Sequence, residues 1–102
     1  MTNASEICQT AANLVGGPRA AQHGDKTANF TNIAKLWNSY LACRARQAAL
    51  PYSPLTALDV ANMMILLKMA RQMTGEYNPD DFVDMAGYAG CAGEIAAAAR
   101  PK

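Results

Sequence analysis

Aspartates near position 80 are the residues of this chain best suited to hold a metal ion. Asp81 and Asp84 are three positions apart in a segment that we predict to be helical, so their carboxylates project from nearly the same face. Mg²⁺ binds such oxygen pairs and completes its shell with water or substrate phosphates. Acidic residues in a first helical turn also complement the helix dipole, an interpretation that fits Asp80 best. Asp81 and Asp84 are therefore candidate magnesium ligands.

Two basic side chains interrupt an otherwise apolar helical segment. Lys68 and Arg71 are about one turn apart, and the apolar residues around them force both to the edge of the core. At such an edge they could bind a phosphate, together with Asp84 as a further ligand-binding residue. The alternative is an ion pair between one of these cations and Asp84.

One histidine lies in a polar segment predicted to be a loop. His23 stands close to Asp25, and the pair could act in acid–base chemistry, bind a metal or contribute to a ligand site. A single histidine in a polar loop is alternatively only solvated. We keep His23 as a candidate ligand-binding residue.

The helix after this loop carries side chains that suit a nucleobase or a ribose. Amide side chains follow what we predict to be its polar side, and Trp37 offers an aromatic surface for stacking. An aromatic residue at helical spacing can equally belong to the core. Asn29 and Trp37 are the candidate binding residues; the amides together are Asn29, Asn32 and Asn38.

Capping signals and apolar spacing predict four helices that position these residues. The first begins at Asn3, the third at the Thr56 capping box with Asp59, and the fourth at Asn78, where Pro79 follows. The second helix is predicted from Thr27 to about Cys43. The conformations of loops 16–26 and 44–55 cannot be predicted from the sequence.

Two helices carry unusual compositions. Residues 60–70 are apolar on nearly every side, which predicts a central, buried helix. The fourth helix contains Gly87, Gly90 and Gly93, which lower helix propensity and favour a site where another backbone packs closely. We predict an all-α, compact bundle of four or five helices.

Composition limits the class of protein. The chain of 102 residues predicts a single domain, residues 1–102, and its 51% hydrophobic content favours a homo-oligomer. A formal net charge of +1 argues against bulk DNA binding, and no apolar stretch is long enough to cross a membrane. Three scattered cysteines predict neither a disulfide framework nor a zinc site, but buried thiols in a cytoplasmic protein.

Ordered motifs between Val15 and Ile95 resemble a small phage and prophage family of unknown function. The matching segments are His23–Asp25, Asn29–Trp37, Asp59–Ala61, Leu66–Arg71 and Asp81–Ala89. That family is distantly similar to the all-α nucleotide pyrophosphohydrolases of the MazG type, which hold magnesium on E-E-x-x-E and E-x-x-D helices. Asp81 and Asp84 could stand for the second motif, whereas residues 31–35 lack the glutamates of the first.

The resemblance implies a phage accessory protein of the host-cell cytoplasm that binds a nucleotide or a nucleotide-derived small molecule. Such a protein would sequester a host defence signal without turning it over. A divergent magnesium-dependent nucleoside triphosphate pyrophosphohydrolase is the first alternative, and a structural or protein-interaction module is the second. No cofactor other than Mg²⁺ is implied.

Overall fold

The computed structural model describes residues 3–17, 25–47 and 53–101, and these ranges contain four helices and no strand. The helices are α1 (Ala4–Gly16), α3 (Lys26–Gln47), α4 (Ala57–Gln72) and α5 (Pro79–Ala98). This confirms the predicted all-α class. No helix in the described ranges is long and apolar enough to cross a bilayer.

Local capping explains most of the helix ends. The Asn3 side chain accepts a hydrogen bond from the Glu6 backbone N–H at 2.9 Å, and Thr56 and Asp59 form the predicted capping box. Asn78 caps α5 with Pro79 in its first turn. The α4–α5 connection includes Gly75, whose φ of 78° favours glycine.

The second predicted helix is longer than its apolar pattern indicated. We expected it to end near Cys43, but α3 continues to Gln47. Residues 44–47 contain no proline or glycine, and basic side chains in the last turn stabilise the negative end of the helix dipole. This places Arg44 on the helix and not in the following loop.

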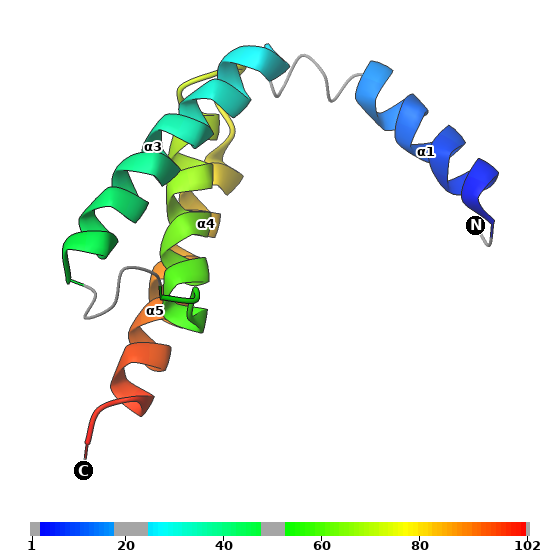
Figure 1. Cartoon of the computed structure of the whole chain (residues 1–102). Helices are drawn as coiled ribbons and strands as arrows, with labels where there is room; N and C mark the ends of the chain where they lie inside the picture. The colour runs from blue at the N-terminus through cyan, green and yellow to red at the C-terminus, as the bar shows by residue number, and fades with distance from the viewer. Residues whose placement is uncertain (1–2, 18–24, 48–52, 102) are drawn as a thin grey trace.

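α4 lies between α3 and α5, and consecutive helices run antiparallel (Figure 1). α3 and α5 each pack on α4 and make little contact with each other, so the three helices form one layer. The central position predicted for α4 is confirmed. Its complete burial is not, because a layer leaves two sides of its middle helix open; Leu67, for example, is only half-buried.

The buried apolar core is small. It is made of five residues of the described chain: Ile33, Ala61, Met63, Ala70 and Ala92. The three cysteines, which we expected to be buried, are all exposed: Cys8, Cys43 and Cys91. The expected close packing against Gly87, Gly90 and Gly93 is also absent in the described chain, where a Cβ at any of these positions would meet no atom within 4 Å.

α1 stands apart from the three-helix layer (Figure 1). The radius of gyration of the Cα atoms is 16.9 Å, whereas a compact domain of this length has about 13 Å. None of the residues of α1 is buried. The separation of α1 from the layer therefore leaves its apolar residues exposed.

Candidate functional site

The four charged residues singled out from the sequence meet between α4 and α5. Lys68 Nζ lies 2.9 Å from Asp84 Oδ2, and Arg71 Nε lies 3.9 Å from Asp81 Oδ1. Because the two helices are antiparallel, residues spaced by one turn on α4 face residues spaced by one turn on α5. We call Lys68, Arg71, Asp81 and Asp84 the charge row.

Lys68 and Asp84 form an ordinary ion pair within the charge row. The Lys68 side chain is 13% exposed and that of Asp84 is 43% exposed, so solvent screens the pair from one side. This contact is the ion pair that we weighed against phosphate binding. The described residues contain no group of three His, Cys, Asp or Glu that could hold a metal. Magnesium binding by Asp81 and Asp84 stays a prediction.

The second pair of the charge row, Arg71 and Asp81, leaves hydrogen-bonding groups of both side chains unused. The Asp81 side chain is only 7% exposed, yet its partner Arg71 Nε is 3.9 Å away, beyond hydrogen-bond distance. The guanidinium of Arg71 makes no hydrogen bond within the described part of the chain. A buried carboxylate and a half-buried guanidinium with unused hydrogen-bonding capacity can both bind a further group.

Asn29 is buried, contrary to our expectation that it lies on the polar side of its helix. It is 8% exposed, and its Oδ1 atom is buried without a hydrogen-bond partner in the described structure. Asn29 is buried because it lies two turns before Trp37, and therefore on the same side of α3, which packs on α4. Trp37 contacts Met63, and the two helices are antiparallel, so a residue two turns earlier on α3 lies beside a residue two turns later on α4. Asn29 is therefore level with Arg71.

Trp37 forms a contact between helices. Its indole Nε1 donates a hydrogen bond to the backbone carbonyl of Met63 at 2.8 Å, which fixes the ring against α4. A ligand role for Trp37 stays a prediction. The same holds for His23, which lies outside the described residues.

A second polar cluster, at the opposite end of the α3–α4 pair, was not identified as a site from the sequence. We call Tyr40, Arg44, Thr56 and Asp59 the Asp59 cluster. The Asp59 carboxylate accepts hydrogen bonds from the Tyr40 hydroxyl at 2.6 Å, Arg44 Nε at 2.8 Å and the Thr56 backbone N–H at 2.8 Å. The Thr56 hydroxyl donates to the same carboxylate at 2.9 Å.

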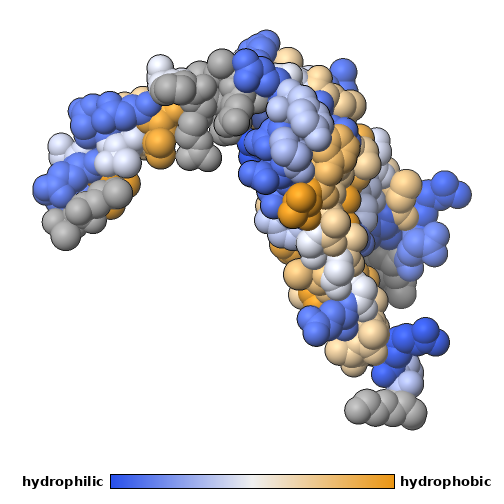
Figure 2. All heavy atoms as spheres, turned by 180° about the vertical axis from the view of Figure 1, so that it is seen from behind, coloured by the Kyte–Doolittle hydropathy of each residue, from blue (hydrophilic) through white to orange (hydrophobic). Residues whose placement is uncertain are grey.

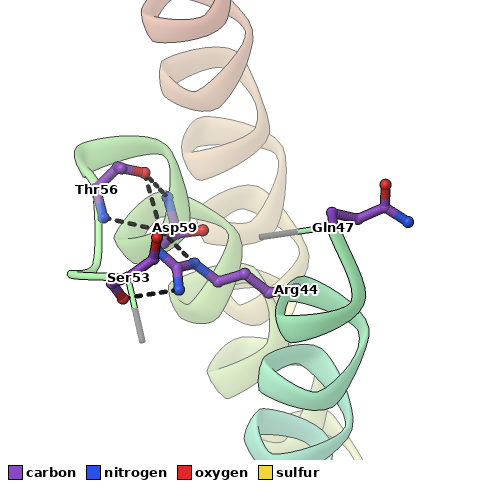
Figure 3. A pocket seen from close by; sticks show the side chains of 5 residues that line it. All are labelled: Arg44, Gln47, Ser53, Thr56 and Asp59. Carbon is purple, nitrogen blue, oxygen red and sulfur yellow. Dashed lines mark hydrogen bonds and ion pairs between the residues drawn. The ribbon is translucent and has the colours of Figure 1, made fainter. Parts of the chain in front are cut away.

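Arg44 is fully engaged in this cluster. Besides Asp59, its guanidinium donates to the backbone carbonyls of Ser53 and Pro54, so it ties the end of α3 to the segment that leads into α4. An open hollow of about 230 Å³ is lined by Arg44, Gln47, Ser53, Thr56 and Asp59 (Figure 3). The saturated hydrogen bonds indicate a structural joint between α3 and α4.

The cluster controls the protonation of its two acidic groups. Burial raises the pKa of the Asp59 carboxyl, but the hydrogen bonds from Tyr40, Thr56 and Arg44 outweigh it and lower the pKa from 3.8 to about 2. Burial, followed by the hydrogen bond to Asp59, raises the pKa of Tyr40. Tyr40 therefore stays a hydrogen-bond donor at neutral pH.

This pKa predicts a loss of stability in acid. A carboxyl whose pKa is lower in the folded state stabilises the fold above its unfolded pKa, and this contribution disappears as the pH falls from 3.8 to about 2. The shift corresponds to about 2.5 kcal/mol. Urea unfolding at pH 6 and pH 2 should show that wild type loses about this much more stability than Asp59→Asn. Equal losses in the two proteins would contradict the assignment.

Comparison with known proteins places this arrangement in a family. A model of a domain of unknown function, DUF6378, matches residues 6–96. The chain belongs to the DUF6378 family. It is also 39% identical over 89 residues to the Gene 55 protein of Mycobacterium phage D29, and 43% identical over 84 residues to that of Mycobacterium phage L5.

Both of these relatives are phage proteins, which supports the resemblance to a phage family noted in the sequence. The matches cover 87% and 82% of this chain but 52% and 48% of the relatives, so the chain spans about half the length of the curated proteins it matches. No solved structure matches the chain. The residues matched by DUF6378 include α3, α4, most of α5 and both polar clusters.

Proposed function

We propose that this phage protein binds a nucleotide or a nucleotide-derived small molecule where the start of α3, the end of α4 and the start of α5 meet. Arg71 carries the proposal. Its guanidinium is half-buried, lies beside a buried carboxylate and makes no hydrogen bond in the described chain. Guanidinium groups in this condition bind phosphate through two parallel N–H donors.

Arg44 and Arg71, which both lie in ion pairs between helices, show the contrast. Arg44 donates to Asp59 and to two backbone carbonyls, which leaves it little capacity for a ligand. Arg71 has one carboxylate neighbour, at 3.9 Å. Arg44 therefore serves the fold, whereas Arg71 has donors available to a phosphate.

The remaining groups at this end suit the other parts of such a ligand. Lys68, one turn from Arg71, would contact a second phosphate oxygen, and Asn29 has a free carbonyl oxygen for a base or ribose donor. The carboxylates of Asp81 and Asp84 would repel a bare phosphate. Mg²⁺ bound to both carboxylates and to the phosphate would remove this repulsion.

We favour binding without turnover. The MazG-type alternative requires a further set of acidic ligands, and the described residues hold no group of three acidic, histidine or cysteine side chains. Release of pyrophosphate from a nucleoside triphosphate would establish the alternative. Failure to bind any nucleotide would favour a protein-interaction module.

The biological setting of the proposal comes from the phage relatives. In the cytoplasm of an infected cell, a small protein that binds a nucleotide signal of host defence would lower its free concentration. We further propose that the protein acts as a homo-oligomer, because large apolar side chains remain exposed on all four helices.

A thermal-shift screen tests the binding site. Nucleoside triphosphates and cyclic nucleotides, each with and without Mg²⁺, are added to wild type and to Arg71→Gln and Lys68→Ala. A ligand at a hundred times its Kd stabilises the folded state by about 2.7 kcal/mol. We expect each variant to lose most of this shift while its ligand-free Tm stays within a few degrees of wild type.

The control is Lys35→Ala, which removes an exposed cation from α3 without touching the charge row. It should keep the full ligand-induced shift. The proposal fails if no nucleotide raises the Tm of wild type, or if Arg71→Gln and Lys68→Ala respond to the ligand as Lys35→Ala does.

A further inference from the structure

The chain exposes more surface than a protein of its mass should. Its accessible surface is 7410 Å², whereas a compact monomer of this mass exposes about 5,600 Å². The excess of about 1,800 Å² exceeds the roughly 800 Å² that each partner buries in a standard stable interface. The area available is sufficient for an extensive protein–protein contact.

Part of this excess lies on α1. Ile7, Leu14 and Val15 fall on one face of the helix and are 50%, 48% and 52% exposed. Figure 2 shows apolar atoms on the side of α1 turned toward the layer, with open space between them, and polar atoms on the outer side. α1 is therefore amphipathic, as a packing helix is, but its apolar face packs on nothing in the described part of the chain.

A complementary face lies on α5. Asp81, Asp84 and Ala92 turn toward α4, which leaves a strip of small residues on the opposite side of the helix. A Cβ at Gly87, Gly90 or Gly93 would meet no atom within 4 Å. The strip is apolar apart from Glu94 and consists of Val83, Ala86, Gly87, Gly90, Gly93 and Ala97.

We propose that two copies of the chain exchange α1, so that α1 of each copy packs on the glycine strip of α5 in the other. Large apolar side chains on α1 fit the shallow surface that the glycines leave, and no other part of residues 3–17, 25–47 and 53–101 covers either face. Because each copy carries both surfaces, two reciprocal contacts close a two-fold dimer and leave neither surface exposed. This interaction is independent of the proposed nucleotide site.

The first test changes each surface separately and measures mass by light scattering. Wild type should have twice the 10.9 kDa of one chain. Gly90→Leu fills the strip while raising helix propensity, so the chain should still fold. We expect this variant and Leu14→Arg to raise the dimer Kd by about tenfold or more, with unchanged helical content by circular dichroism.

Matched controls place similar changes elsewhere. Ala45→Leu adds a large apolar side chain to an exposed position of α3, and Gln9→Arg adds a charge to the opposite side of α1. Both should remain dimeric. A monomeric wild type overturns the proposal, and so does a Gly90→Leu or Leu14→Arg variant that dimerises as tightly as its control.

The second test separates exchange between copies from contact within one chain. In a background with Cys43→Ser and Cys91→Ser, Gly90→Cys is joined to the native Cys8 by a short bifunctional maleimide. Chains labelled with ¹⁴N and ¹⁵N are mixed before the reaction. Linked peptides that combine light α1 with heavy α5 support the exchange, whereas links confined to one label or absent altogether overturn it.

Discussion

Asp59→Ala is expected to destabilise the protein by about 3–5 kcal/mol, because it removes the charged partner of a partly buried guanidinium. Arg44 would keep its contacts with two backbone carbonyls but lose the carboxylate that balances its charge. The substitution also leaves the Tyr40 hydroxyl and the Thr56 backbone N–H without their acceptor. Against a total stability of about 5–15 kcal/mol, this loss would remove a large share of the free energy of unfolding.

Urea unfolding followed by circular dichroism measures this effect. Asp80→Ala is the control, since Asp80 is an exposed acidic residue in the first turn of α5 and should contribute only about 0.3–1 kcal/mol through the helix dipole. If the two variants were equally stable, the Asp59 cluster could not be the joint between α3 and α4.

Ala70→Asp should be at least as damaging, with a loss of more than about 3 kcal/mol, because it places a charge at a completely enclosed position. Ala70 is 0% exposed and lies in α4 on the side that also carries Met63 and Asp59. Neighbouring backbone and side chains leave no space for water around the new carboxylate. We expect the variant to be unfolded or to lose its cooperative thermal transition.

Ala34→Asp provides the comparison on an exposed position of α3. It changes the same side chain and should cost less than about 1 kcal/mol, chiefly through lower helix propensity. A cooperative transition of Ala70→Asp close to that of Ala34→Asp would show that the three-helix layer is not the stable unit of the fold.

Several features of the fold could be predicted from the sequence because they depend on residues close together in the chain. Helix starts at Asn3, Thr56 and Asn78 follow from side chains that bond to backbone groups two or three residues later. The ion pair between Lys68 and Asp84 could also be anticipated, since a short connection between α4 and α5 favours antiparallel packing. The sequence also indicated an all-α domain.

Burial was predicted less well. Phe82 follows the apolar spacing of its helix, but it is 46% exposed and packs on Tyr77, with ring centroids 6.3 Å apart. That contact is a hydrophobic staple across the start of α5. Apolar periodicity shows which face of a helix is apolar, but it does not show whether that face is covered within the chain or by a partner.

Only the tertiary structure could distinguish the two arginines and locate Asn29. Arg44 and Asp59 are separated by the connection between α3 and α4, so their contact depends on how far α3 extends and how the helices align. The same alignment buries Asn29 level with Arg71 and leaves both with unused hydrogen-bonding groups. The sequence determined which side chains could bind a ligand, and the register of three helices decided which of them are satisfied, because hydrogen bonds act over about 3 Å.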